Sequence, residues 1–312
     1  MPDIGIVIVT YNSQAEVGAC LDSVMSTGAE IVVVDNASAD GTLTEVRRRG
    51  VRFVANSTNR GFAAAVNQGF AALATPYVLL LNPDAEVLGG LDALCAACCL
   101  PSSAGAGGKL EDAQGHAQIG FMVRQLPSAL VLTLEALLLN RSVPNNPVNR
   151  RYRGLQLNYN SRIPVEQPAG AFLMVRRAVW QELGGFDESF FPLWFEDVDF
   201  CRRAVDRGYQ FYYVPEAAAR HLGGHSISQL TVEKRRIYWY GSLLRYSAKH
   251  FRPSSFRVVC VAVVAGSLLR SLGETVLNRS FSPLAAYGKV VRHASRCLLF
   301  GWGDGAVPSG PK

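Results

Sequence analysis

Short apolar runs rich in Val and Ile recur along residues 1–90, and polar, turn-forming residues bound each of them. Four runs have the length and composition of buried parallel strands: residues 5–10, 31–34, 51–56 and 77–82. Between the first two, residues 13–27 place apolar side chains at helical spacing. Such alternation builds right-handed crossovers, so the pattern predicts an α/β fold with a doubly wound, Rossmann-like, mostly parallel sheet.

A polar cluster follows each predicted strand. The clusters are, in chain order, TYN, DNASADGT, NSTNRG and NPD. The carboxyl ends of parallel strands lie along one edge of a sheet, where open α/β proteins bind their ligands. Four consecutive clusters therefore predict one ligand that crosses the whole edge.

Beyond residue 90 the pattern is less regular. Residues 91–163 contain PSSAGAGG, SVPNNPVN and isolated glycines, which we interpret as loops with short helices. Residues 167–191 predict a strand followed by a helix that ends at Gly184, and the chain after His225 is helical and basic.

The composition is that of a globular protein. With 312 residues and 49% hydrophobic content, the chain can bury the core of one large domain or of two smaller ones. No basic start followed by an apolar run opens the sequence, so export is not expected.

Seven scattered cysteines predict reduced thiols in the cytoplasm. A zinc site at Cys95, Cys98 and Cys99 lacks a second pair of ligands, and we expect core thiols there.

The net charge of +6 is unevenly distributed. Up to Leu230 the chain has 18 Lys and Arg against 22 Asp and Glu, whereas from Thr231 onward it has 13 against 3. A basic tail is typical of nucleic-acid binding, of attraction to an anionic membrane, or of a solvated helix face. Only twelve uncharged residues separate Arg257 from Arg270, and a spanning helix needs about 20. We expect this tail to lie on a bilayer and not to bind nucleic acid, with packing on the rest of the chain or dimerisation as the alternatives.

Two of the polar clusters suggest a pocket for a pyrimidine base. Tyr11 offers a ring on which a base can stack, and Asp35 can accept the N3–H of uracil or thymine. Alternatively, DNASADGT simply begins a helix, because Asn, Ser and Asp are favoured caps. The chain has no Gly-x-Gly-x-x-Gly after the first strand and no Gly-Lys-Ser/Thr, which disfavours a nicotinamide enzyme and excludes a phosphate-loop NTPase.

The NPD cluster places a carboxylate directly after the fourth strand. Asp84 could hold a hard divalent cation there, leaving the other coordination positions for diphosphate oxygens and water. An Asn-Pro-Asp turn that binds no ligand is the alternative.

Six segments, in this order and spacing, together resemble glycosyltransferase family 2, and most closely its rhamnosyltransferase-like branch. They are IVIVTYN, VVVDNASADGT, NRGFAAAVNQGF, LLLNPDAEV, PAGAFLMVRR and GGFDESFFPLWFEDVDFCRR, spread over residues 4–226. The resemblance implies the GT-A fold, a nucleotide-diphosphate-sugar donor, a divalent metal (Mg²⁺ or Mn²⁺) as cofactor and inversion at the anomeric carbon.

The resemblance also implies roles for individual residues. Tyr11 and Asp35 would hold the base, and Asp84 matches the last acid of the family's Asp-x-Asp motif. Asn82 replaces the first acid of that motif, a departure that bears on metal dependence. The set expected to bind the nucleotide sugar is Thr10, Tyr11, Asn12, Asp35, Asn36, Asn59, Arg60, Gly61, Asn67, Asn82, Asp84 and Gly170.

Three carboxylates lie among four aromatic residues in FPLWFEDVDFCRR. Carboxylates crowded against apolar surface lose hydration and repel one another, so folding gains little from them. The family's Glu-Asp motif falls on Glu196 and Asp197, and Asp197 is the expected base that removes the acceptor's proton. In a helix, Glu196 and Asp199 would share a face and Asp197 would point elsewhere. The alternative is charge placement at a helix start, with Arg202 and Arg203 as partners.

RHLGGHS supplies two candidate imidazoles. His221 matches the position at which many GT-A enzymes complete metal or diphosphate coordination, although a lone histidine after a strand is more often structural. His225 and Ser226 are expected to belong to a mobile loop over the donor.

We therefore expect an inverting glycosyltransferase that transfers L-rhamnose from dTDP-rhamnose to a saccharide or a polyprenyl-diphosphate-linked acceptor in cell-surface glycan synthesis. UDP-GlcNAc and UDP-galactose would use the same base pocket and stay open as donors. A sugar-phosphate nucleotidyltransferase would need a Gly-rich loop with Arg and Lys, which TYNSQAEVG is not. An inactive carbohydrate-binding relative would not need Asp84 and Asp197.

The expected organisation has three parts. Residues 1–90 form the nucleotide-sugar-binding half of the GT-A domain, and residues 91–228 form its acceptor-binding and catalytic half. Residues 229–312 form a helical region that binds a membrane or mediates a homodimer. The expected location is the cytoplasm, peripheral on the inner face of the cytoplasmic membrane.

Overall fold

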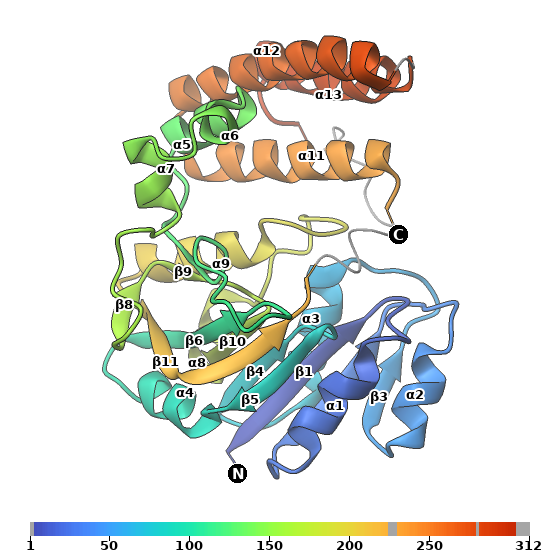
Figure 1. Ribbon diagram of the computed structural model, residues 1–312, viewed down its shortest axis with the longest axis vertical. Helices are drawn as coiled ribbons and strands as arrows, with labels where there is room; N and C mark the ends of the chain where they lie inside the picture. The colour runs from blue at the N-terminus through green and yellow to red at the C-terminus, as the bar shows by residue number, and fades with distance from the viewer. Residues whose placement is uncertain (1–2, 224–229, 279–280, 304–312) are drawn as a thin grey trace.

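A nine-stranded mixed sheet forms the centre of the molecule in the computed structural model, which describes residues 3–223, 230–278 and 281–303. Figure 1 shows this sheet in the lower part of the molecule, with helices on both faces. The strand order is β3 (Arg52–Ala55), β2 (Glu30–Asp35), β1 (Ile4–Thr10), β4 (Tyr77–Leu81), β10 (Phe172–Arg176), β6 (Ser103–Glu111), β11 (Gln210–His221) and β5 (Ala85–Gly89), with β8 (Ile163–Val165) beside β11.

The four strands predicted from the first ninety residues are confirmed, and they pair in parallel. Alternate side chains of β1 enter two different cores. Ile4, Ile6 and Ile8 lie on one face of the sheet, which is covered by α1 (Val17–Met25), α2 (Thr42–Arg48) and α4 (Leu91–Cys98). Val7 and Val9 lie on the other face, which is covered by α3 (Phe62–Ala72), α8 (Arg177–Leu183) and α9 (Glu196–Asp206). Burial on both faces explains why these strands are continuous apolar runs.

The segment PSSAGAGG is wrongly predicted as a loop, because most of it belongs to the buried strand β6. Glycine is required there by the closeness of the neighbouring strand. A Cβ atom on Gly105 would lie 2.3 Å from the carbonyl oxygen of Met174 in β10. Glycines that are typical of loops in a sequence can thus mark a close backbone approach inside a sheet.

Two later strands bring distant residues to the carboxyl edge of β4. The strand β10 runs antiparallel to β4, so Phe172 pairs with Leu81, and the N–H of Asn82 donates to the carbonyl oxygen of Ala171 at 3.0 Å. The strand β11 ends with His221 paired to Ala85. The start of β10 and the end of β11 therefore lie beside the NPD cluster.

A separate helical layer lies above the sheet in Figure 1. It contains α5 (Ala129–Ala136), α6 (Leu139–Ser142), α7 (Pro147–Tyr152), α11 (Val232–His250), α12 (Pro253–Asn278) and α13 (Ser282–Phe300). The helices α5, α11, α12 and α13 share an apolar core, to which Phe190 from the segment before α9 also belongs. In the figure, α11 lies between the α12–α13 pair and the sheet, with α9 directly beneath it. The predicted boundary at residues 228 and 229 falls outside the described residues.

The expectation that the apolar tail segment is too short to span a bilayer needs correction. The helix α12 continues past both flanking arginines, and residues 253–277 are long and apolar enough, by length and composition, to cross a membrane. The most apolar 18-residue window has a mean hydropathy of 1.7, and 44% of this window is buried inside the protein. One face of this helix therefore belongs to the core, and exposed apolar side chains lie along another face.

Candidate active site

The first two polar loops are joined by the carboxylate of Asp35. It is fully buried, and it accepts hydrogen bonds from Thr10 Oγ1 at 2.8 Å and from the N–H of Ser38 at 3.0 Å. Asn12 extends the junction, because its N–H donates to Ser38 Oγ at 2.8 Å and its Oδ1 accepts from the N–H of Ala39 at 2.7 Å. Asp35 therefore shapes the loop that carries Tyr11, and its contact with a base stays a prediction.

Asn36 organises the third polar loop. Its Nδ2 donates to Asn59 Oδ1 at 3.0 Å and to the carbonyl oxygen of Gly61 at 3.1 Å, and its Oδ1 accepts from the N–H of Arg60 at 2.9 Å. Gly61 has φ +85°, and a Cβ atom there would lie 2.8 Å from the ring of Phe191. The third loop thus lies against the aromatic segment that leads into α9.

The hydrogen bonds of the Asn67 side chain do not join it to the other residues predicted to bind the nucleotide sugar. Its amide exchanges two hydrogen bonds with the backbone of Phe186, at 2.9 and 3.0 Å, and donates a third to Glu188 at 2.9 Å. These bonds tie α3 to the loop after α8. The structure thus gives Asn67 a role in holding these two elements together.

Asp84 and His221 face each other at the edge of the sheet. His221 Nε2 lies 3.6 Å from Asp84 Oδ1, and both side chains are buried. Gln118 fixes the imidazole from the other side, because its Nε2 donates to the carbonyl oxygen of His221 at 2.7 Å and its Oε1 lies 3.1 Å from Nδ1. The ring of Phe121 stacks on His221 at 5.2 Å.

This arrangement fits a divalent cation. Since Gln118 Oε1 can only accept, Nδ1 of His221 must carry the hydrogen, and Nε2 presents a lone pair toward the Asp84 carboxylate. Burial lowers the pKa of His221, although Asp84 opposes the effect, so the imidazole stays neutral. Two acceptors that face each other are what a cation would bridge. Among the described residues no group of three His, Cys, Asp or Glu could hold a metal, so other ligands would come from the substrate and water.

The cysteines do not contribute to such a site. All seven are free thiols, and Cys98 is buried, as expected. Cys99 is exposed rather than part of the core, with its Sγ 3.0 Å from the hydroxyl of Tyr77.

Asp197 lies in the first turn of α9, beside the segment that leads into β10. Its Oδ1 accepts from the N–H of Val198 at 2.8 Å, and its Oδ2 faces the N–H of Gly170 at 3.3 Å and Gln167 Nε2 at 3.4 Å. Burial raises the pKa of Asp197, and the two backbone donors and the charge of Arg124 reduce this effect. An aspartate with a raised pKa, partly open to solvent, is suited to accept a proton from a hydroxyl.

The other two carboxylates of this cluster are buried, as the helical pattern predicted. Glu196 has no hydrogen-bond partner for Oε2, and burial followed by repulsion from Asp197 raises its pKa well above the usual range. Asp199 pairs with Arg203 at 2.7 Å. Arg202 was a second expected partner of these acids, but it pairs with Asp206 instead.

Five residues near these groups were not predicted from the sequence: Gln118, Arg124, Gln167, Lys249 and His250. Each acts on a partner far away along the chain, as Gln118 does on His221 across 103 positions. Only the fold brings them together, and no local pattern could have found them. The predicted loop residues His225 and Ser226 lie outside the described residues.

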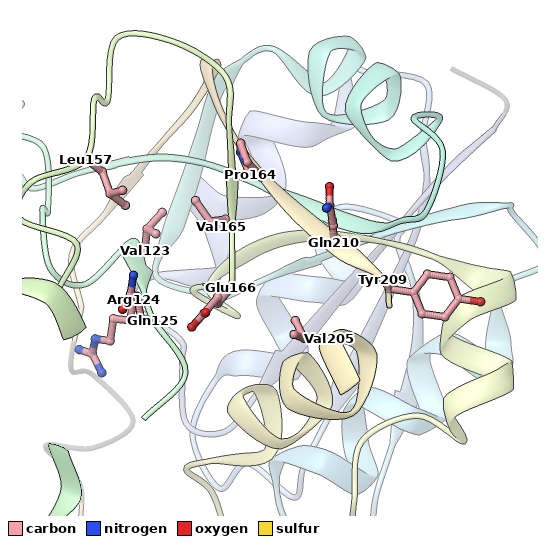
Figure 2. A pocket seen from close by; sticks show the side chains of 10 residues that line it. All are labelled: Val123, Arg124, Gln125, Leu157, Pro164, Val165, Glu166, Val205, Tyr209 and Gln210. Atoms are coloured by element: carbon pink, nitrogen blue, oxygen red, sulfur yellow. The ribbon is translucent and has the colours of Figure 1, made fainter. Parts of the chain in front are cut away.

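A cavity of about 300 Å³ has Arg124 in its lining, and Figure 2 shows the residues around it. Its lining is Val123, Arg124, Gln125, Leu157, Pro164, Val165, Glu166, Val205, Tyr209 and Gln210. The strands β7 (Val123–Arg124) and β9 (Gln167–Pro168) pair at its border. Arg124 belongs to both places, because it lines this cavity and its charge acts on Asp197.

Comparisons with known proteins bear on the family and the fold. Residues 5–93 match the family described as Glycosyl transferase family 2, and residues 154–302 match Glycosyl transferase family group 2. N-acetylglucosaminyl-diphospho-decaprenol L-rhamnosyltransferase of Mycobacterium tuberculosis is 33% identical over 240 residues, which cover 71% of this chain and 76% of that protein. Low-salt glycan biosynthesis hexosyltransferase Agl10 of Haloferax volcanii is 26% identical, over 65% of this chain and 62% of that protein.

A solved structure shows the same fold. The mannosyltransferase PcManGT from Pyrobaculum calidifontis, in complex with GDP-Man and Mn²⁺, superposes with a TM-score of 0.52 at 16% identity, over 97% of this chain and 88% of that chain. The expected GT-A fold is confirmed by this likeness. With the family match and the mycobacterial relative, the chain belongs to glycosyltransferase family 2 and is a glycosyltransferase.

Proposed function

We propose that this glycosyltransferase transfers L-rhamnose from dTDP-rhamnose to a saccharide carried on a polyprenyl diphosphate, in the synthesis of a cell-surface glycan. The observation that carries the proposal is Asp197, a half-buried carboxylate with a raised pKa at the edge of the sheet. The choice of sugar and acceptor is supported by the printed name of the mycobacterial relative, which is 33% identical.

The proposed reaction is a single displacement with inversion. Asp197 accepts the proton of the acceptor hydroxyl while the oxygen of that hydroxyl attacks the anomeric carbon of the donor. The bond from that carbon to the diphosphate breaks on the opposite face, and its electron pair leaves with the nucleotide diphosphate. Burial and repulsion from Asp197 raise the pKa of Glu196, which favours its neutral form and so limits the negative charge beside Asp197.

Asp84 and His221 are the proposed ligands of Mg²⁺ or Mn²⁺. When bound, the metal supplies positive charge to the leaving diphosphate. The departure at Asn82 leaves one carboxylate from the motif, and neutral His221 supplies the second ligand. The relative solved with GDP-Man and Mn²⁺ shares the fold, which supports a divalent cation here.

The proposed donor site follows the loops at the edge of the sheet. Tyr11 stacks on the pyrimidine, and Asp35 with Thr10, Asn12 and Asn36 holds the surrounding loops. The remaining predicted contacts to the ribose, diphosphate and sugar are Asn59, Arg60, Gly61, Asn67, Asn82 and Gly170. Uracil presents the same N3–H as thymine, so UDP-GlcNAc and UDP-galactose remain the alternative donors.

Thermal shift with a panel of nucleotide sugars tests the donor. A ligand that binds only the folded protein raises its melting temperature with concentration and affinity. We expect dTDP-rhamnose with Mn²⁺ to give the largest shift, GDP-mannose to give none, and EDTA to reduce the shift with dTDP-rhamnose. A larger shift with a UDP-sugar would replace rhamnose, and no shift with any pyrimidine donor would overturn the site.

We also propose that the enzyme is cytoplasmic and binds the inner face of the membrane through α12. Its exposed apolar side chains recur at helical spacing: Val258, Val261, Leu268, Leu269, Leu272 and Val276. Arg252 and Arg257 lie exposed at the start of this helix, where they can attract anionic headgroups. Arg270 does not contribute to this attraction, because it donates to Tyr240 and to the carbonyl oxygens of Glu135 and Ala136. A homodimer that buries the same face is the alternative.

A further inference from the structure

The carboxylate of Asp199 joins the catalytic helix to the helical layer. It is fully buried two residues after Asp197, and its Oδ2 accepts from Arg203 Nε at 2.7 Å. Its Oδ1 accepts from His250 Nε2 at 2.7 Å and lies 2.8 Å from Lys249 Nζ. Arg203 belongs to α9 itself, but Lys249 and His250 are the last two residues of α11. Two of the three partners of Asp199 therefore come from another layer of the molecule.

The helix α11 also holds the turn that leads into α9. Ser242 Oγ donates to the carbonyl oxygen of Leu193 at 3.1 Å, and the ring of Tyr246 lies 5.4 Å from that of Phe195. Trp194 and Phe195 have φ +78° and +71°, a left-handed conformation that non-glycine residues keep only where their surroundings hold them. The contacts from α11 are thus placed where the backbone of the catalytic turn needs support.

Lys249 also forms an ion pair with a second carboxylate. Its Nζ lies 2.6 Å from Asp187 Oδ2, in the loop between α8 and α9. Lys249 therefore bridges Asp187 and Asp199, and the imidazole of His250 is fixed by packing on Tyr246 at 4.7 Å. His250, with 8% of its side chain exposed, is the buried partner of Asp199, whereas Lys249, at 34%, reaches Asp199 from the surface.

The charges around Asp199 affect its neighbours. Burial alone would raise the pKa of Asp199, but the hydrogen bond from His250 and the charges of Arg203 and Lys249 lower it below the usual value. Asp199 is therefore an ionised group close to Glu196 and Asp197. Without its partners from α11, a buried and poorly compensated negative charge would disfavour ionisation of Asp197.

On the assumption that Asp197 is the base, as proposed above, we propose that Lys249 and His250 are positioning residues for catalysis. They fix the first turn of α9 and compensate the charge of Asp199, so that Asp197 is ionised and correctly oriented when the acceptor binds. Neither residue contacts the reacting atoms in this proposal.

The proposal predicts a change in the pH profile as well as in rate. Asp197 is within electrostatic reach of Arg124 from β7 and of Glu196 and Cys201 from α9, and Asp199 acts on the same Glu196 and Cys201. Removing the positive charge of Lys249 makes the potential at Asp197 more negative and raises its pKa further. The acid limb of kcat therefore moves to higher pH, which loss of stability alone would not cause.

The test compares two matched pairs of full-length variants. Lys249→Met removes the positive charge, and Lys249→Arg keeps it. His250→Phe removes the N–H that donates to Asp199, and His250→Gln keeps an N–H donor. We expect kcat of the Met and Phe variants to fall on the order of 10- to 100-fold, since small misplacements of a catalytic group cost this much. The KM for the donor stays near wild type, and the melting temperature falls because the buried Asp199 carboxylate loses a partner. The acid limb of Lys249→Met shifts upward, and the Arg and Gln variants recover most of the rate.

Arg52→Met is the control, because it removes an exposed ion pair to Glu30, 3.1 Å long, at the far edge of the sheet. Wild-type kcat and an unmoved acid limb in Lys249→Met would overturn the positioning role. Insolubility of both Lys249→Met and His250→Phe would also overturn it, because the pair would then support the fold as a whole. Asp197→Asn is measured alongside: if that variant keeps its turnover, the base assignment fails instead.

Discussion

Asp197 is the one carboxylate of its cluster that keeps part of its side chain open to solvent, and this difference can be tested at the level of one residue. Asp197→Asn keeps the shape but cannot accept the proton. We expect kcat to fall on the order of 10²- to 10⁴-fold while donor binding, measured by calorimetry, is retained. Asp206→Asn, on the exposed side of the same helix, is the control. Turnover of Asp197→Asn within about threefold of wild type would exclude Asp197 as the base.

The raised pKa of Asp197 adds a pH dependence to this prediction. The base works only when ionised, so kcat is full above its pKa and is lost as the pH falls through that value. Because burial raises the pKa, the acid limb should lie above the ordinary aspartate value of about 3.9. A limb at or below that value would contradict the burial of the side chain.

Gln118 supplies a second test at the residue scale, because it fixes the tautomer of His221 through two hydrogen bonds. Loss of such a supporting residue typically weakens metal binding about 10- to 100-fold. We expect Gln118→Leu to weaken Mn²⁺ binding by this amount, and Asp84→Ala to weaken it further, in calorimetry with dTDP present. Gln114→Leu, in an exposed turn of the same segment, should bind Mn²⁺ as the wild type does. Equal affinities in all of these variants would remove the metal site.

At the scale of elements, the exposed face of α12 is the feature to test. Replacing Leu268, Leu269 and Leu272 with Ser should abolish the salt-resistant part of binding to anionic liposomes, because apolar insertion is not screened by salt. The charged part, from Arg252 and Arg257, should remain and weaken with ionic strength. Cosedimentation at several salt concentrations measures both.

Leu88→Ser is the matched control, since Leu88 is 48% exposed on β5, away from the helical layer. Equal binding by the triple variant and the wild type would remove the membrane role. A change from dimer to monomer in the triple variant, seen by light scattering, would assign this face to a second copy instead. Deleting the helical region after Ser247 would be a poorer test of membrane binding, because the deletion also removes Lys249 and His250.

Elements differ in how clearly the sequence predicts them. The four parallel strands could be predicted because burial on both faces leaves a continuous apolar run in each. The strand β6 could not, because the closeness of β10 requires glycine at Gly105 and glycine is otherwise typical of turns. The length of α12 was missed for a similar reason: Arg257 and Arg270 interrupt the apolar run, but Arg270 is satisfied inside the protein by Tyr240 and the end of α5.

At the scale of the whole molecule, the ordered motifs predicted the fold and the family, because those motifs lie at the ends of strands. Proximity between remote segments could not be predicted. The pairing of Asp84 with His221 was expected from the family, but the support from Gln118 depends on how residues 112–122 fold back on β11. The partners of Asp199 on α11 are separated from it by 50 and 51 positions and carry no local signal.

The position of α11 has a consequence for recombining this protein with its relatives. A chimera joined between α9 and α11 would combine a catalytic helix from one parent with residues 249 and 250 from the other, and its Asp199 would face side chains not selected for it. Exchange of acceptor preference by swapping C-terminal regions would then fail for reasons unrelated to the acceptor. A crossover placed before Asp187 keeps Asp187, Asp199, Lys249 and His250 together from one parent, and it is the boundary at which such hybrids should remain active.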